Sequence, residues 1–154
     1  MNTFLVYVGD DNFCRVLPEE LDRSKSDNGR VKVMAFPPLG IQTLASVLRQ
    51  RGHQVRMFDT CHPQMKAEDI AQAVAQEQPD VIALSFLSTT TYPAVKSMAR
   101  RLKAEGANMP IIVGGAFATL NADRILDDCP DIDCVGVGEG EELLLDYLDH
   151  RDDP

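Results

Sequence analysis

The sequence is poor in basic residues. Lysine and arginine total 15 against 24 aspartates and glutamates, which gives a net charge of -9 at pH 7. Such a charge repels nucleic-acid phosphates and anionic membrane surfaces, so we expect no nucleic acid and no membrane as partners. The amino terminus has no basic segment, and its apolar run is too short for a signal peptide or a membrane span. A cytoplasmic location is therefore expected.

Metal-binding and nucleotide-binding motifs are also missing. The 4 cysteines form neither a CxxC pair nor a CxxxCxxC motif, and the 3 histidines lack the spacing of metal ligands. No GxxxxGK[ST] phosphate loop is present. The GxG pattern at Gly136, Gly138 and Gly140 follows the last apolar segment, whereas a dinucleotide fingerprint follows the first. The sequence thus shows no zinc or iron–sulfur motif and disfavours the common nucleotide sites.

Short apolar segments rich in valine and isoleucine alternate with segments of helical period. This alternation is typical of βαβ units. We expect an α/β fold with a doubly wound, five-stranded parallel sheet, flavodoxin-like or Rossmann-like, with strand order 2-1-3-4-5 and helices on both faces. The predicted strands are 4–8, 54–58, 81–85, 111–113 and 134–137. The predicted helices are 41–51, 67–78, a helix between Thr91 and Gly106, 121–127 and 141–148.

The length fits a single domain. A chain of 154 residues, 44% of them hydrophobic, can bury one core, which we place in residues 1–150. Residues 10–39 are longer than an ordinary βα connection and are predicted to be an insertion loop. Its apolar patch VKVMAF fits a small extra strand or a loop over the sheet edge. Residues 151–154 have no apolar face and are expected to begin a linker or to be an artificial chain end.

The loops predicted at the carboxyl edge of the sheet are unusual. Ligands of open parallel sheets bind at this edge. Three of the loops, SFLSTTTYP, GGAFATLN and GVGEGEE, are rich in serine, threonine and glycine. Small residues let a ligand approach the backbone and offer hydroxyl and N–H groups. The pattern predicts a slot for a flat or long ligand rather than a catalytic centre.

Two other activities of this fold class fit the sequence less well. A response-regulator receiver needs a phosphorylatable aspartate after the third strand and a lysine after the last, where Ser85 and Gly138 stand. Flavodoxin-type binding of FMN would favour hydroxyls after the first strand, where Asp10 and Asp11 stand. Both interpretations are therefore disfavoured.

Four segments in a fixed order carry a resemblance to a known family. They are PPLGIQTLASVLRQRGHQV, SFL at 85–87, GGAFAT from Gly114, and DCVGVGEGEE. This arrangement resembles the amino-terminal cobalamin (B12)-binding domain of cobalamin-dependent radical SAM enzymes. Methionine synthases and corrinoid mutases share the SxL and GG segments but carry a DxHxxG loop before the first helix. Here Ala35 and Pro37 replace its Asp and His, so the histidine that would ligate cobalt is missing.

The resemblance implies that cobalamin binds base-off, without a protein histidine on cobalt. Its dimethylbenzimidazole tail would pass between sheet and loops, with room left by Gly114 and Gly115 and with Pro37, Pro38 and Leu39 beneath cobalt. Burying about 150 Å² of aromatic ring at about 25 cal/mol per Å² contributes roughly 4 kcal/mol, enough to anchor the cofactor. The cofactor-binding residues implied are Pro38, Leu39, Gly40, Ser85, Phe86, Leu87, Ser88, Thr89, Thr90, Gly114, Gly115, Ala116, Phe117, Gly138, Glu139 and Gly140. No catalytic residue and no metal ligand is predicted.

The resemblance also implies a cofactor domain of a radical SAM methyltransferase or related enzyme, in which cobalamin passes a methyl group from S-adenosylmethionine to a substrate radical. The [4Fe-4S] cluster and S-adenosylmethionine would belong to a radical SAM catalytic domain acting in cis or in trans. This chain alone is expected to bind rather than catalyse. Two alternatives remain: a stand-alone corrinoid carrier or sensor, and a cofactor-free flavodoxin-like interaction module. Likewise, Ser85 fits a helix-capping serine, and Gly114–Gly115 fits a tight turn without a ligand.

Overall fold

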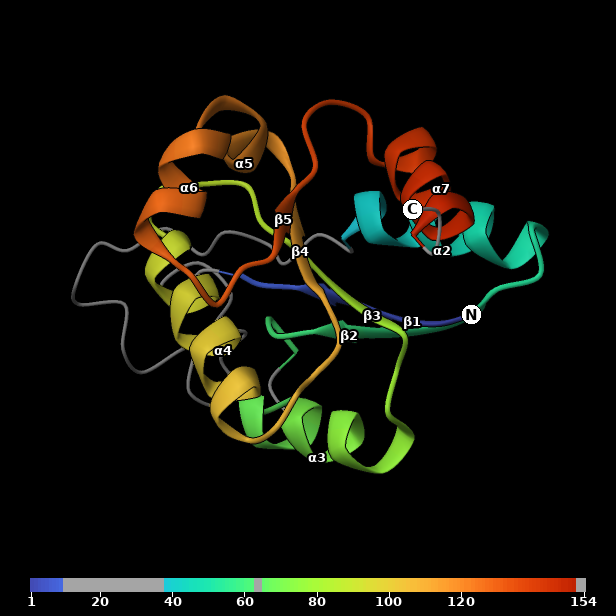
Figure 1. Cartoon of the computed structure of the whole chain (residues 1–154), viewed down its shortest axis with the longest axis horizontal. Helices are drawn as coiled ribbons and strands as arrows, with labels where there is room; N and C mark the ends of the chain where they lie inside the picture. Colours follow the sequence, from blue (N-terminus) through green and yellow to red (C-terminus); the bar gives the residue numbers. More distant parts are fainter. Residues whose placement is uncertain (10–37, 63–64, 152–154) are drawn as a thin grey trace, which may run out of the picture.

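A parallel β-sheet forms the centre of the molecule (Figure 1). A computed structural model describes residues 1–9, 38–62 and 65–151. Within them the sheet has five strands in the order β2-β1-β3-β4-β5, all paired in parallel. The strands are β1 (Asn2–Tyr7), β2 (Gln54–Asp59), β3 (Val81–Ser85), β4 (Ile111–Gly114) and β5 (Cys134–Val135). The predicted fold class and strand order are confirmed.

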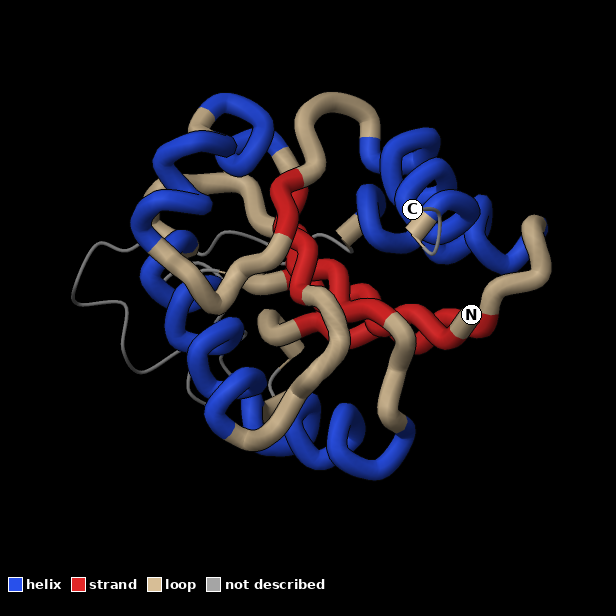
Figure 2. Tube along the Cα trace, in the orientation of Figure 1, coloured by secondary structure: helices blue, strands red, loops and turns tan. Residues whose placement is uncertain are grey.

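Helices cover both faces of this sheet (Figure 2). The described helices are α2 (Leu39–Gln50), α3 (Ala67–Glu77), α4 (Tyr92–Ala104), α5 (Ala116–Leu120), α6 (Ala122–Asp128) and α7 (Gly140–His150). Buried residues of α3, α4, α5 and α6 pack in one cluster, and buried residues of α2 and α7 pack in a second cluster on the opposite face. The sheet is therefore doubly wound, and α2 and α7 together form one of its two covering layers.

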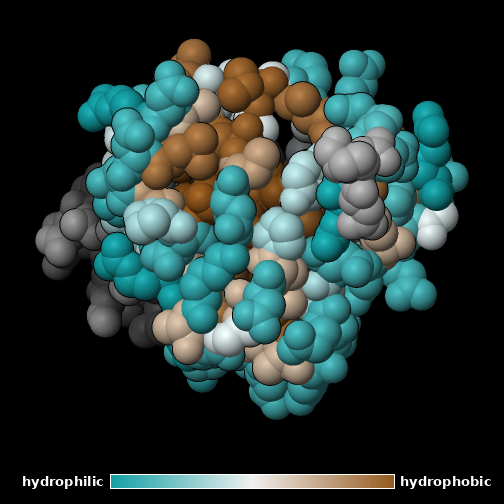
Figure 3. All heavy atoms as spheres, viewed as in Figure 1, coloured by the Kyte–Doolittle hydropathy of each residue, from teal (hydrophilic) through white to brown (hydrophobic). Residues whose placement is uncertain are grey.

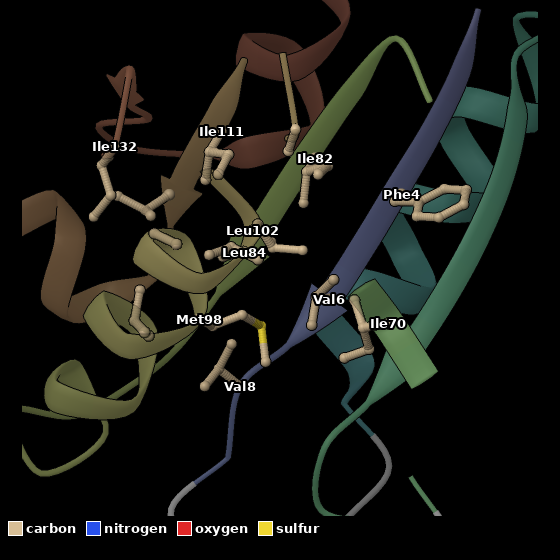
Figure 4. Packing of buried hydrophobic residues seen from close by; sticks show 14 of the residues in the cluster. Phe4, Val6, Val8, Ile70, Ile82, Leu84, Met98, Leu102, Ile111 and Ile132 are labelled. Atoms are coloured by element: carbon tan, nitrogen blue, oxygen red, sulfur yellow. The ribbon is translucent and has the colours of Figure 1, made fainter. Parts of the chain in front are cut away.

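Strand β1 shows how the sequence produces the two layers. Successive side chains of a strand point to opposite faces. Phe4 and Val6 join the cluster beneath α3 and α4, whereas Leu5 joins the cluster beneath α2 and α7. Figure 4 shows Phe4 and Val6 with Leu84 and Met98 in the first of these clusters. Because β1 is central and covered on both faces, its residues form a continuous apolar run rather than an alternating one.

Helix α4 forms as its sequence predicts. Thr91 is the N-cap residue, and a proline follows in the first turn, where its missing N–H is not needed. Val95, Met98, Ala99 and Leu102 form the buried stripe, as expected from their spacing of three and four residues. Burial of each large apolar side chain stabilises the fold by about 1.5–3 kcal/mol.

Some predicted boundaries are wrong. Strand β1 starts and ends earlier than 4–8, and β5 ends at Val135 rather than at residue 137. After Val135 the Gly136 N–H still bonds to the Val113 carbonyl, and Gly138, with a positive φ of 104°, lies in the turn that leads to α7. Helix α5 is not predicted from the sequence, because its five residues, AFATL, are too few to show a helical period.

Two predicted segments lie largely outside the described residues. The insertion loop was placed at 10–39, and its residues 10–37, with the possible extra strand, are not described. At its end, Pro38 is the N-cap residue of α2 and Leu39 is the first residue of that helix. The Arg151 guanidinium donates to the carbonyl of Asp80 over 2.8 Å, and residues 152–154 are not described. No helix among the described residues is long and apolar enough to cross a membrane.

Candidate functional site

A cleft of about 770 Å³ lies at the carboxyl ends of β3, β4 and β5. It is bordered by the sheet, by α2 and α7, by the start of α5, and by the connection between β5 and α7. We call this connection, residues 136–139, the cleft loop. Figure 1 shows how these elements are arranged. Hydrophobic residues gather around a hollow in this part of the surface (Figure 3). The apolar lining from sheet and helices includes Leu5, Ala83, Ile112, Ile41, Leu44 and Leu144. Such a lining suits a mostly apolar organic ligand.

Half of the predicted cofactor-binding residues border this cleft. They come from the start of α2, the end of β3, the β4–α5 turn and the β5–α7 connection, segments that lie far apart in the sequence. These residues are Gly40, Ser85, Gly114, Gly115, Ala116, Gly138, Glu139 and Gly140. Ser85 and Gly114 are direct partners in the β3–β4 register. The carboxyl edge of the sheet therefore brings together residues from all four segments of the resemblance.

The other half of the predicted set does not border the cleft. These residues are Pro38, Leu39, Phe86, Leu87, Ser88, Thr89, Thr90 and Phe117. Phe86 is fully buried in the cluster beneath α3 and α4, because the alternation along β3 turns it away from the face that Ser85 borders. Its ring lies 6.0 Å from that of Tyr92 and 5.6 Å from that of Phe117. These aromatic residues join β3, α4 and α5.

The hydroxyl groups after β3 bond to one another. The Ser88 hydroxyl shares hydrogen bonds with the hydroxyls of Thr90, at 2.8 Å, and Thr91, at 3.0 Å. The Thr91 N–H donates to the Ser88 carbonyl over 3.2 Å. This network orders the turn before α4.

The two adjacent glycines at the end of β4 serve different purposes. A Cβ on Gly115 would lie 2.2 Å from the Phe86 carbonyl oxygen, and its φ of 106° is unfavourable for any other residue. A Cβ on Gly114 would meet no atom within 4 Å, and Gly114 borders the cleft. The prediction gave both glycines the same purpose, that of leaving room for a ligand. In the structure, Gly114 leaves the cleft open, while Gly115 permits a close approach of two backbone segments.

Sequence reasoning missed Thr119 as a cleft residue. Thr119 lies on α5, borders the cleft, and accepts a hydrogen bond of 3.2 Å from the N–H of Gly138 in the cleft loop. It is the threonine of GGAFAT, a segment that the resemblance includes, but its position at the cleft depends on α5, which the sequence does not predict. The apolar residues Leu5, Ala83 and Ile112 were missed as well. Their alternation along the strands could have assigned them to the face of α2 and α7.

The polar side chains that border the cleft come mostly from α5, α7 and the segment before α7. They are Ser85, Thr119, Cys134, Glu139, Glu141, Asp146 and Tyr147. Burial raises the pKa of Tyr147 above its ordinary value and outweighs the opposing charge of Arg151, so the phenol is protonated at neutral pH. Cys134, which also borders the cleft, is a free thiol. In the part of the chain that the structure describes, no group of three or more His, Cys, Asp or Glu residues could hold a metal ion. The cleft thus offers hydrogen-bonding groups around an apolar space.

An open α/β sheet with an apolar cleft at the carboxyl ends of its strands defines a small-molecule-binding domain of the doubly wound class. The sequence model of the B12 binding domain matches residues 28–148. The chain belongs to this B12-binding domain family, and the predicted family and cofactor, cobalamin, are confirmed.

Relatives of known description extend well beyond this domain. An uncharacterized methyltransferase from Pyrococcus horikoshii is 30% identical over 120 residues, which cover 78% of this chain and 26% of the relative. The hopanoid C-3 methylase of Methylococcus capsulatus is 32% identical over 123 residues, covering 77% of this chain and 23% of the relative. The chain therefore spans about a quarter of the length of these relatives.

Solved structures share the fold. The cobalamin-dependent S-adenosylmethionine radical enzyme OxsB, solved with aqua-cobalamin bound, superposes with a TM-score of 0.69 at 18% identity, over 97% of this chain and 18% of that chain. A cobalamin-binding protein from Desulfitobacterium hafniense superposes with a TM-score of 0.62 at 13% identity, over 95% of this chain and 58% of that chain.

Proposed function

We propose that this chain binds cobalamin base-off, with the nucleotide tail in the cleft and no protein side chain on cobalt, as the cofactor domain of a radical SAM methyltransferase or related enzyme. The position of Gly114 carries the proposal: the residue ends a central strand, borders the cleft, and has open space where a Cβ would lie. The cleft volume of about 770 Å³ is within the range of small-molecule sites.

The chain's own residues supply the contacts to the tail. Leu44 and Ala83, which are half-buried and border the cleft, offer an apolar surface to the aromatic base, whose burial stabilises binding by roughly 4 kcal/mol for about 150 Å². Ser85 and Tyr147 offer hydroxyl groups to the polar part of the tail. When bound, cobalamin supplies a cobalt centre that can carry a methyl group.

An apolar protein surface beneath the corrin fits binding without a protein ligand. Leu39, the first residue of α2, is 70% exposed, and Leu87, two residues after the end of β3, is 62% exposed. We assign these side chains to contacts with the corrin, outside the cleft. Ala35 and Pro37, which replace the Asp and His of DxHxxG, lie outside the described residues. Their lack of a ligating group supports a cofactor that is held without a protein ligand on cobalt and whose affinity depends on the tail.

The similarity to much longer enzymes supports a partner domain. OxsB is a cobalamin-dependent radical SAM enzyme, and this chain corresponds to 18% of its length. We assign the [4Fe-4S] cluster and S-adenosylmethionine to a radical SAM domain, in cis or in trans, in the cytoplasm. A stand-alone corrinoid carrier is the second candidate. It is favoured by dimethylamine corrinoid protein 1 of Methanosarcina acetivorans, 30% identical over 110 residues, which cover 69% of this chain and 50% of that protein.

Binding of hydroxocobalamin tests the proposal directly. The purified chain is mixed with hydroxocobalamin and desalted, and its visible spectrum is recorded. Cobalamin that elutes with the protein and shows a base-off spectrum is the expected result. The Gly114→Leu variant should bind at least about tenfold more weakly, a difference of about 1.4 kcal/mol, because its side chain enters the space assigned to the tail.

Ala104→Leu is the matched control, since Ala104 is exposed at the end of α4 and does not border the cleft. It should bind like the unmodified chain. A colourless protein fraction would instead support the cofactor-free module. Equal affinity of Gly114→Leu and the unmodified chain would remove the cleft from the binding site.

A further inference from the structure

We propose that Thr119 positions the cleft loop over the nucleotide tail and donates its hydroxyl proton to an oxygen of the tail's ribose or phosphate. This inference rests on the proposed function, because it assumes a tail in the cleft. It assigns to a threonine of α5 a role in discriminating corrinoids that carry a nucleotide tail from corrinoids that lack one.

The start of α5 has a fixed position relative to the sheet. The Phe86 N–H donates to the Gly114 carbonyl over 3.2 Å, and Gly115 lies so close to Phe86 that no side chain fits there. Helix α5 begins at the next residue, and the Thr119 N–H donates to the Gly115 carbonyl over 3.0 Å. Thr119 therefore lies one helical turn after the close contact between the Gly115 and Phe86 backbones, and this contact fixes the position of the turn.

The cleft loop, in contrast, has few contacts of its own. It follows β5, an edge strand of two residues, and the Gly136 N–H makes the last bond to the sheet, 2.8 Å to the Val113 carbonyl. The next bond across the cleft is the 3.2 Å bond from the Gly138 N–H to the Thr119 hydroxyl. Gly138 has a positive φ and no atom within 4 Å of its Cβ position. The Thr119 hydroxyl thus fixes the middle of the loop at the cleft.

The chemistry of a hydroxyl group leaves Thr119 a second bond to make. A threonine hydroxyl accepts through its lone pairs and donates one proton. The Gly138 N–H occupies a lone pair, and within the described part of the chain no hydrogen bond uses the proton. Thr119 borders the cleft, so this proton is available to a ligand atom that lies there. The ribose and phosphate oxygens of the tail are such acceptors, whereas cobinamide, the same corrin without the nucleotide, lacks them.

Two substitutions at Thr119 test the inference with two corrinoids. Thr119→Val keeps the shape and removes the hydroxyl, while Thr119→Ser keeps the hydroxyl. Affinities for hydroxocobalamin and for cobinamide are measured by titration of the visible spectrum. Loss of two hydrogen bonds should weaken hydroxocobalamin binding by Thr119→Val about tenfold, with cobinamide binding unchanged within about twofold. Thr119→Ser should restore hydroxocobalamin affinity to within about threefold of the unmodified chain.

A matched control lies on the other half of the same sheet edge. The Thr60 hydroxyl accepts a 2.9 Å bond from the Gly9 N–H, and Thr60 does not border the cleft. Thr60→Val should leave the ratio of the two affinities unchanged. The inference is overturned if Thr119→Val weakens both corrinoids equally, if it weakens neither, or if Thr60→Val changes the ratio as much. If the unmodified chain binds both corrinoids equally, the tail does not occupy the cleft, and the proposed function itself fails.

Discussion

Gly114 and Gly115 are neighbours, but only Gly114 has room for a side chain. At Gly115 the obstacle to a side chain is the protein itself, because the Phe86 backbone occupies the Cβ position. At Gly114 the protein leaves the space open. The GG pair therefore joins a structural requirement at Gly115 to the binding role proposed for Gly114, and substitution in the apo protein tests the structural requirement alone.

Alanine at each position should give opposite results for stability. Gly115→Ala combines an unfavourable positive φ with a close backbone contact, so we expect a loss of at least about 2 kcal/mol in the free energy of unfolding. Gly114→Ala should change it by less than about 1 kcal/mol. Urea unfolding of the cofactor-free chains measures both. Equal losses would show that the tight backbone contact at Gly115 has little energetic weight.

The adjacent residues Ser85 and Phe86 show what a motif can and cannot predict. The SxL pattern correctly indicated a strand end at the cleft, and Ser85 borders it. Phe86 belongs to the same motif but lies in the opposite layer, because strand alternation assigns neighbours to different faces. A motif alone does not say which of its residues pack in the core and which face a ligand. The alternation of side chains along β3, continued to Phe86, could have separated the two.

At the scale of elements, the ring cluster of Phe86, Tyr92 and Phe117 connects β3, α4 and α5. The Tyr92 hydroxyl donates to the Asp128 carboxylate of α6 over 3.0 Å, and the Lys96 ammonium donates to the same oxygen over 2.8 Å. Burial, together with the bond to Asp128, raises the pKa of Tyr92 well above its ordinary value. The cluster thus ties the helix that carries Thr119 to the larger core.

Tyr92→Phe should lower stability only where the phenol is protonated. At neutral pH we expect a loss of about 0.5–1.5 kcal/mol from the missing hydrogen bond. Because the folded-state pKa is raised, this contribution is complete below the unfolded pKa of about 10 and is lost as pH rises toward the folded value. The stability difference between the two chains should therefore shrink above about pH 10.

Urea unfolding at neutral pH and at several pH values above about 10 measures this difference, and the comparison of two chains cancels the other tyrosines. A difference that stays constant across this range would assign the effect of Tyr92→Phe to packing rather than to its hydroxyl group.

The elements divide into those that the sequence could predict and those that it could not. The β-strands and long helices follow from apolar runs and from stripes such as the one in α4, so their order and class were predicted correctly. Helix α5 is too short to show a period, and the path of the cleft loop depends on Gly138 and its bond to Thr119. Contacts between segments that lie far apart in the sequence shaped the cleft, and no local pattern encodes them.

At the scale of the whole molecule, the cleft leaves apolar side chains in contact with water. Leu120 is 82% exposed and Val137 is 53% exposed, one on α5 and the other in the cleft loop. Exposed apolar groups on two elements that border one cleft are typical of a binding site. A cofactor that covers them adds apolar burial to a domain whose two cores lie on opposite faces of one sheet.

Hydroxocobalamin should therefore stabilise the entire domain. At a free concentration of 100 times Kd, binding adds about 2.7 kcal/mol to the free energy of unfolding. For a domain of this size, that corresponds to a rise in Tm of roughly 5–10 °C, measurable by calorimetry. Cobinamide at the same concentration should produce a smaller rise, because it leaves the cleft empty. If both corrinoids raised Tm equally, and Gly114→Leu did not reduce the rise, the stabilising contacts would lie on the corrin, and the apolar walls of the cleft would contribute nothing to affinity.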